Sequence, residues 1–156
     1  MAFTELNSVE YFVIDQLSGV NLNHQQLTEP PVKFGAKWIY KSPGSLDRGV
    51  NEVLVESELR EALIRLNPEI KANNDLADEV IYRLRAILIS VNQVGLVKAN
   101  EEFFKWMTGE KTMPFGANNR HVPVRLIDFE NLSNNIYWLT NQFKVHHRET
   151  KIPDIV

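Results

Sequence analysis

KIPDIV, residues 151–156, closes the sequence and predicts the opening of a strand. Pro153 pre-sets the backbone, and the β-branched residues Ile155 and Val156 favour an extended chain. A chain end without structure is usually polar and frayed, whereas this one is apolar after Pro153 apart from Asp154. The stretch therefore predicts an incomplete sheet that continues beyond residue 156, and it makes Asp154 the first candidate for a functional role.

The length and composition fit one globular domain. With 156 residues the chain can bury a real core but is short for two domains, so residues 1–156 are expected to form a single domain. Hydrophobic residues make up 44% and charged residues 24%, as in an average globular protein. No apolar run approaches the roughly 18 residues that a membrane-spanning helix requires, so no membrane partner is expected.

The charge and the cysteine content exclude further classes of protein. The N-terminal stretch MAFTELNSVE lacks the basic and apolar regions of a signal peptide. The absence of cysteine excludes disulfides and thiolate metal sites and fits a reducing cytoplasm. A formal net charge of −3 excludes a generally cationic nucleic-acid-binding domain, so any contact with DNA must be local.

Apolar residues at helical spacing predict helices over Thr4–Leu17, Leu54–Leu66, Asp75–Val91 and Ala99–Thr108. Glu10 lies within the apolar stripe of the first helix. A Glu in such a stripe usually sits at its border, with the carboxylate in water. The alternative is a carboxylate held near a functional site, and the residues alone leave both interpretations open.

The later part of the chain changes to a strand pattern. The runs HVPVRLIDF (121–129) and IYWLTNQFKV (136–145) flank the turn-forming cluster ENLSNN (130–135), so we expect them to pair as a hairpin. HHRETK (146–151) is expected to be a polar loop, and the Pro- and Gly-rich stretch 21–50 predicts one or two short strands. Helices first and strands later predict a mixed α/β, α+β-like domain with an incomplete mixed sheet.

Several common catalytic motifs are absent. GEKT (109–112) lacks the upstream Gly and the Gly-Lys adjacency of a P-loop, so no ATP site is expected in this chain. There is no HExxH or Gly-x-Ser-x-Gly motif, and His146 and His147 would point to opposite faces of an extended chain. The carboxylates remain. Asp154 is either an ordinary strand-edge or turn residue, or a ligand for Mg²⁺, which prefers hard oxygen ligands.

Three stretches in the same order resemble the N-terminal nuclease domain of the R subunit (HsdR) of type I restriction-modification enzymes. They are VLVESELREALIRLNPEI (53–70), VRLIDFENLSNNIYWLTNQFKV (124–145) and KIPDIV (151–156). In that family a helix with LREAL…LNP precedes an LIDF…NN…NQF hairpin and a PDIV strand, which a strand with an E-x-K motif follows. The resemblance runs in register from about Glu5 to Val156 and implies a PD-(D/E)xK restriction-endonuclease-like core.

The resemblance implies roles for two carboxylates. Asp154 matches the Asp of the PD motif, which is catalytic and a Mg²⁺ ligand. Glu10 matches the helix Glu that many such nucleases keep near the metal, with Glu5 as the secondary candidate. The Glu and Lys of the E-x-K motif would lie beyond Val156. We therefore expect the chain to be an N-terminal fragment that is inactive by itself.

The resemblance also implies the setting of the complete enzyme. The parent subunit is expected to be a cytoplasmic type I site-specific deoxyribonuclease that cleaves unmodified double-stranded DNA with Mg²⁺ and ATP. ATP would bind to a motor outside residues 1–156, and the methyltransferase and specificity subunits are the expected partners. The alternative for this chain is a non-catalytic α/β scaffold that docks the motor or a partner subunit.

Overall fold

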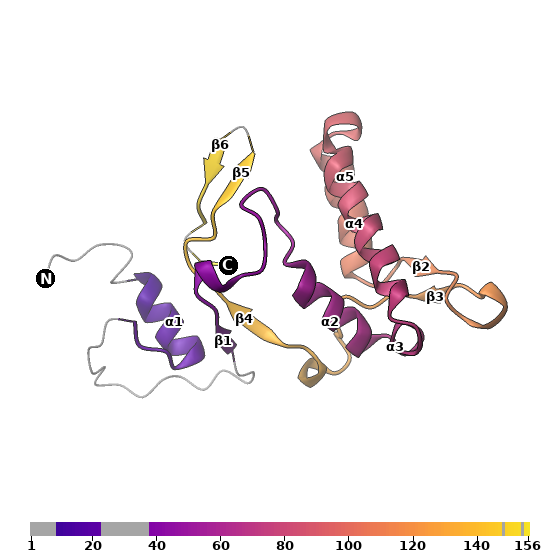
Figure 1. Ribbon diagram of the computed structural model, residues 1–156, viewed down its shortest axis with the longest axis horizontal. Coiled ribbons are helices and arrows are strands. Elements are labelled where there is room, and N and C mark those ends of the chain that lie inside the picture. Colours follow the sequence, from indigo (N-terminus) through magenta and orange to yellow (C-terminus); the bar gives the residue numbers. More distant parts are fainter. Residues whose placement is uncertain (1–8, 23–37, 148, 154) are drawn as a thin grey trace, which may run out of the picture. The chain divides into compact units, whose positions relative to one another are not determined.

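A computed structural model describes residues 9–22, 38–147, 149–153 and 155–156 (Figure 1). The described residues form two compact units. Unit 1 contains the residues up to Val55 together with Ile136–Val156, and unit 2 is the continuous stretch Glu56–Asn135. The single domain expected over residues 1–156 stays a prediction.

Unit 1 combines one helix with short strands. Its elements are α1 (Tyr11–Ser18), β1 (Trp38–Tyr40), the 3₁₀ turn η2 (Pro43–Ser45), β4 (Tyr137–Leu139), β5 (Val145–His147) and β6 (Glu149–Lys151). β1 and β4 pair in parallel, with Ile39 beside Trp138, whereas β5 and β6 pair antiparallel. Thr140 and Val156 exchange two backbone hydrogen bonds of 2.8 and 2.9 Å, which attaches the last residue of the chain directly after β4.

The core of unit 1 gathers apolar side chains from distant parts of the chain. Its buried members are Leu46, Val55 and Phe143, with Trp138 and Val145 packed against them. The helix α1 lies beside β1 and buries Ile14 completely (Figure 1). Each such side chain stabilises the fold by about 1.5–3 kcal/mol when it is fully buried.

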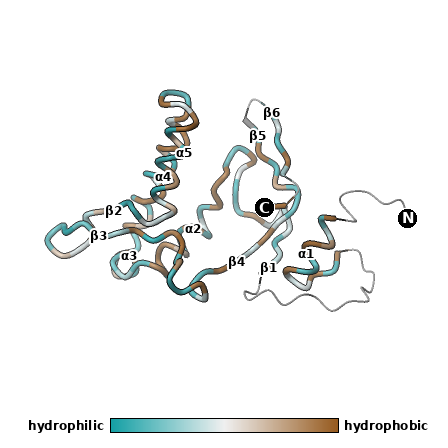
Figure 2. The backbone as a smooth tube through the Cα atoms, turned by 180° about the vertical axis from the view of Figure 1, so that it is seen from behind, coloured by the Kyte–Doolittle hydropathy of each residue, from teal (hydrophilic) through white to brown (hydrophobic). Residues whose placement is uncertain are grey.

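Unit 2 is mainly helical. Its elements are α2 (Glu56–Leu66), α3 (Pro68–Ala72), α4 (Asp75–Val94), α5 (Leu96–Met107), β2 (Thr112–Met113), η3 (Ala117–Asn119), β3 (Val122–Pro123) and η4 (Leu132–Asn134). Hydrophobic and hydrophilic residues alternate along α4 and α5, as in amphipathic helices (Figure 2). Together the four helices bury Leu63, Ile70, Val80, Leu84 and Trp106. No helix of the described residues is both long and apolar enough to cross a membrane.

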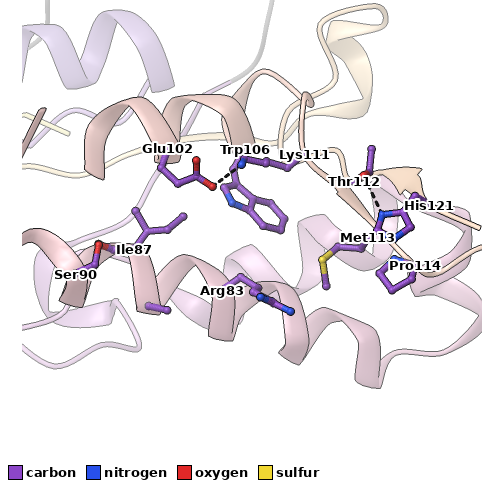
Figure 3. A pocket seen from close by; sticks show the side chains of 11 residues that line it. Arg83, Ile87, Ser90, Glu102, Trp106, Lys111, Thr112, Met113, Pro114 and His121 are labelled. Atoms are coloured by element: carbon purple, nitrogen blue, oxygen red, sulfur yellow. Dashed lines mark hydrogen bonds and ion pairs between the residues drawn. The ribbon is translucent and has the colours of Figure 1, made fainter. Parts of the chain in front are cut away.

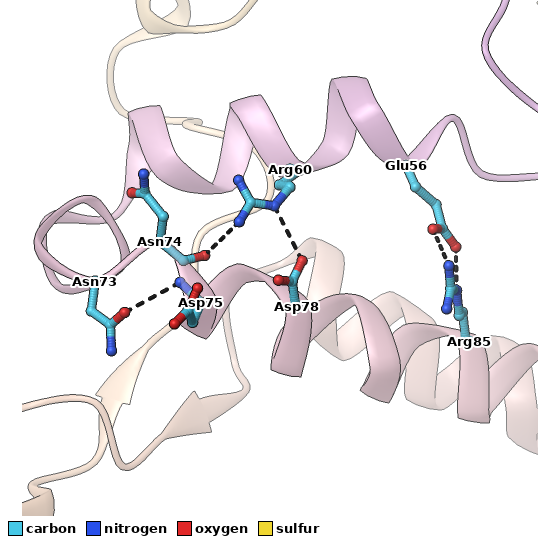
Figure 4. Close-up of polar contacts among 7 residues, drawn as sticks. All are labelled: Glu56, Arg60, Asn73, Asn74, Asp75, Asp78 and Arg85. Atoms are coloured by element: carbon cyan, nitrogen blue, oxygen red, sulfur yellow. Dashed lines mark hydrogen bonds and ion pairs between the residues drawn. The ribbon is translucent and has the colours of Figure 1, made fainter.

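Ion pairs connect α2 with α4 (Figure 4). Arg60 Nε lies 3.1 Å from Asp78 Oδ1, and Arg60 also donates to the backbone oxygen of Asn74 at 3.2 Å. Further along the two helices, Arg85 donates to both carboxylate oxygens of Glu56. Because largely exposed pairs contribute only about 0–1 kcal/mol each, they orient these helices more than they stabilise them.

The predicted helices are present, with shifted ends. Pro68 does not only end α2 but also begins α3, because proline fits the first turn of a helix. The third predicted helix, expected to end at Val91, continues to Val94, where Gly95 ends it with φ 85°. The predicted cap Thr4 lies outside the described residues.

The predicted hairpin between residues 121–129 and 136–145 is wrong. β3 pairs with β2, and β4 pairs with β1. The order of helices before strands is also wrong, because β1 precedes α2. Most of the expected polar loop 146–151 belongs to the β5–β6 hairpin. The mixed α/β class is confirmed, while the PD-(D/E)xK core stays a prediction.

Side-chain hydrogen bonds within residues 128–135 explain the missing hairpin. Asp128 Oδ1 accepts the N–H groups of Glu130 and Asn131 at 3.0 and 2.9 Å, and Oδ2 accepts from the Asn134 amide at 2.8 Å. The Asn135 side chain exchanges two further hydrogen bonds with the backbone of Asp128, at 2.9 and 2.8 Å. The Asn131 N–H and the Asn134 amide hold the pKa of Asp128 below its usual value. This closed loop replaces the tight turn that a hairpin requires.

Candidate functional site

Glu10 is a buried carboxylate at the start of α1. Together with Val9 it forms a π-helical turn that runs into the helix, with helical φ and ψ of −60° and −49°. Only 3% of its surface is exposed. The interpretation that placed Glu10 at the border of the apolar stripe, with its carboxylate in water, is therefore wrong.

Two side-chain amides hold the Glu10 carboxylate. Gln142 Nε2 donates to Oε1 at 2.7 Å, and Asn141 Nδ2 donates to Oε2 at 3.3 Å. The hydroxyl of Tyr40 donates to Asn141 Oδ1 at 2.9 Å. The site therefore joins residues from the start of α1, the end of β1 and the segment after β4, all within unit 1.

The charge of Glu10 has no cationic partner among the described residues. No described Lys, Arg or His forms an ion pair with it, and its hydrogen-bond donors are the neutral amides of Asn141 and Gln142. Burial raises the pKa of Tyr40, and the nearby Tyr11 and Glu10 raise it further, so its hydroxyl stays protonated as a donor. A buried carboxylate without a counter-charge is costly, and such groups are candidates for binding a cation.

The described residues on both sides of position 154 pair with the segment that carries the two amides. Phe143 N donates to Pro153 O at 3.1 Å, and Asn141 forms an antiparallel bridge with Ile155. Asp154 itself, like the secondary candidate Glu5, lies outside the described residues. The predicted proximity of Glu10 and Asp154 therefore stays a prediction.

The carboxylate oxygens of Glu10 are ligands of the type that Mg²⁺ prefers. Each of its oxygens accepts one amide hydrogen bond, and a carboxylate oxygen has capacity for more than one partner. Glu10 can thus serve as an oxygen ligand or as the neighbour of one. No group of three or more His, Asp or Glu side chains gathers around a metal position in the part of the chain that the structure describes.

Sequence reasoning identified Glu10 but missed Tyr40, Asn141 and Gln142. The NQF stretch at residues 141–143 carries part of the family resemblance, but nothing in its residue types indicated a contact with the first helix. The backbone of Gln142 was also not foreseen: its φ of 51° lies in the left-handed region. These residues become recognisable only once the chain has folded.

A second feature is a cleft of about 560 Å³ in unit 2, between α4, α5 and β2 (Figure 3). Trp106 lines it, as do Lys111 and Glu102, whose Nζ and Oε1 atoms lie 2.5 Å apart. His121 Nδ1 lies 3.1 Å from the Thr112 hydroxyl. Side chains of both charges line the cleft, so its chemistry does not select one class of ligand.

Comparisons with known proteins identify one protein family. A family model described as "Type I restriction enzyme R protein N terminus" matches residues 3–156. The chain is also 26% identical over 156 residues to the type I restriction enzyme HindI endonuclease subunit of Haemophilus influenzae. That alignment covers 96% of this chain but 13% of the relative, so the chain spans about an eighth of that subunit's length. No solved structure matches the chain.

Proposed function

Because the chain belongs to the family of type I restriction enzyme R protein N-terminal regions, we propose that it supplies part of the DNA-cleaving site of such an endonuclease subunit. The parent protein would be a cytoplasmic type I site-specific deoxyribonuclease that cleaves unmodified double-stranded DNA. ATP would bind to a motor outside residues 1–156. The methyltransferase and specificity subunits would be its partners in the complete enzyme.

The observation that carries the proposal is the buried Glu10 carboxylate, which accepts a hydrogen bond from Asn141 in the segment after β4. This segment forms backbone hydrogen bonds with residues on both sides of position 154. A PD-(D/E)xK core would place Asp154 there as a Mg²⁺ ligand, with Glu10 as its neighbour. Mg²⁺ bound at such a site polarises the scissile phosphate and lowers the pKa of a bound water. The residues of this chain would supply carboxylate oxygens and fix their direction.

The remaining Glu and Lys of such a site would come from an E-x-K strand outside residues 1–156. The chain by itself would therefore neither cleave DNA nor hold Mg²⁺ tightly.

Asp154→Ala in the full-length subunit, reconstituted with its partner subunits, tests the proposal. Losing a metal-binding carboxylate removes several kcal/mol of transition-state stabilisation, so cleavage of supercoiled plasmid should fall by orders of magnitude. DNA-stimulated ATP turnover should stay within a few-fold of wild type, because the motor lies elsewhere. The control Asp47→Ala removes an exposed carboxylate of unit 1 and should leave both activities intact.

Either of two results would contradict the assignment. If the Asp154→Ala enzyme retains both activities, Asp154 is an ordinary strand residue. If both activities collapse, Asp154 supports the fold or the assembly, and its catalytic role loses its basis.

One observation favours the second candidate function, a scaffold that docks another part of the enzyme. The end of the α4–α5 hairpin exposes a group of large apolar side chains: Leu88, Ile89, Val94, Leu96 and Val97. The chain spans 13% of its HindI relative, so the expected occupant is another part of the same subunit. Ile89→Lys with Val97→Lys should then weaken ATP turnover and cleavage together in the full-length subunit, whereas a purely catalytic chain would tolerate both changes.

A further inference from the structure

We propose that Gln142 and Asn141 are positioning residues that direct the Glu10 carboxylate while leaving its negative charge available to a cation. The inference rests on the proposed function and deepens it. Asp154 and the E-x-K residues are the family's expected catalytic groups, whereas these two amides would act through Glu10.

The backbone of Gln142 is the first observation. Its φ of 51° is a left-handed conformation, which the described non-glycine residues otherwise adopt only at Asn118 and Asn119. Asparagine tolerates this region because its short side chain can bond locally, but glutamine has no such advantage. Strained residues of this kind persist where the surroundings enforce them, and they cluster at functional sites.

The surroundings of Gln142 fix this conformation from both sides. Phe143 is buried in the core of unit 1, and its N–H donates to Pro153 O at 3.1 Å. Asn141 is buried and bridged to Ile155. With both neighbours held, the left-handed turn at Gln142 directs its amide to Glu10, where the hydrogen bond is 2.7 Å long.

The orientation of the Asn141 amide follows from its partners. An ionised carboxylate can only accept hydrogen bonds, so the nitrogen of the amide must face Glu10. Its oxygen then faces Tyr40, whose hydroxyl donates to it at 2.9 Å. The carboxylate thus sets the orientation of the amide, Tyr40 bonds its other end, and Glu10 receives a second donor.

Neutral donors suit a residue that must attract a metal ion. A lysine or arginine at either position would orient the carboxylate equally well, but it would also cancel its charge. Amides fix the direction of both oxygens without supplying a counter-charge. Among the residues that the structure describes, the arrangement therefore orients Glu10 without neutralising its charge.

Gln142→Gly tests the inference, because glycine adopts the left-handed backbone without strain but lacks the amide. In residues 1–156 the melting temperature should stay within about 4 °C of wild type or rise. The ¹³C NMR signal of the Glu10 carboxyl should shift. In the reconstituted enzyme, cleavage should fall by about tenfold or more, as is typical when the partner of a metal-site residue is lost. A higher Mg²⁺ concentration should restore part of it.

Asn119→Gly is the matched control. Asn119 is an exposed amide residue with φ 58°, and it lies in the other unit. The substitution relieves a similar backbone conformation, so stability should be kept or raised while the Glu10 signal and cleavage stay unchanged. Gln142→Asn is a second test variant, since it accepts the left-handed backbone but its amide is one methylene too short.

The possible results separate this inference from the proposed function. If Asp154→Ala abolishes cleavage while both Gln142 variants cleave with wild-type Mg²⁺ dependence, the positioning role is wrong and the nuclease function stands. If Gln142→Gly melts more than about 4 °C below wild type, the side chain supports the fold and the inference is also wrong. If Asp154→Ala cleaves like wild type, the proposed function fails and the positioning role falls with it.

Discussion

Replacing Glu10 by glutamine measures whether neutral donors alone hold this buried carboxylate. The change keeps the shape of the side chain and removes its charge. Hydrogen bonds to a charged group contribute about 1.5–3 kcal/mol and neutral ones about 0.5–1.5 kcal/mol, so two weakened bonds cost about 2–3 kcal/mol. The new NH₂ group also faces one of the amides, which costs about 1 kcal/mol more.

The opposing contribution is the removal of a buried charge. Desolvating one ion costs several kcal/mol, and Glu10→Gln recovers that cost. Because the two contributions are of similar size, we expect the free energy of unfolding to change by less than about 2 kcal/mol. A carboxylate paired with a buried cation would behave differently, since breaking such a pair from one side costs about 3–5 kcal/mol.

Urea unfolding of residues 1–156, followed by circular dichroism, gives the stability change. Glu101→Gln, an exposed position on α5, is the control and should change stability by less than about 0.5 kcal/mol. In the reconstituted enzyme, Glu10→Gln should lower plasmid cleavage by about tenfold or more and leave ATP turnover intact. A loss of 3 kcal/mol or more would refute the reasoning, because it would reveal a cationic partner, and unchanged cleavage would remove Glu10 from the site.

Three further predictions concern stability, pH and activity. Asn67→Leu removes a buried amide that forms two hydrogen bonds of 2.8 Å with the backbone N–H and C=O of Arg125, so it should lower the free energy of unfolding by about 3 kcal/mol. Urea unfolding measures this change, and the control Asn100→Leu, at an exposed position, should alter the free energy of unfolding little. Asp128 has a lowered pKa in the folded state, so its stabilisation is present above the unfolded value of 3.8 and is lost as the pH falls through the folded pKa. Asp128→Asn should therefore flatten the dependence of melting temperature on pH in this acid range. Residues 1–156 with Mg²⁺ should not nick supercoiled plasmid, and nicking that Asp154→Ala abolishes would show that the active site is complete within this chain.

The helices could be predicted from sequence because the signal is local. Apolar residues at helical spacing determine which side of α2, α4 and α5 is buried, and each helix carries its own pattern. Strand pairing is not local. The partner of β4 is β1, far earlier in the chain, and the loop closed by Asp128 separates the two runs that were expected to pair.

The candidate site likewise combines a residue that the sequence indicated with residues that only the folded structure revealed. The apolar stripe around Glu10 left two interpretations of this residue open, and the family resemblance made it a candidate for the site. Its partners Asn141 and Gln142 break no pattern that the sequence reveals. Their role depends on a left-handed backbone at Gln142 and on contacts with Tyr40 and α1, which tertiary structure alone creates.

The parallel pairing of β1 with β4 has a consequence for how the chain folds. All of unit 2, the continuous stretch Glu56–Asn135, lies between these two strands in the sequence. Pairing them closes a very long loop, whose entropic cost falls if the intervening chain has already become compact. Unit 2 can therefore collapse as soon as it leaves the ribosome, whereas unit 1 must wait for β4 and for Val156, which pairs with Thr140. We therefore expect the segment around Glu10 to acquire its structure after unit 2.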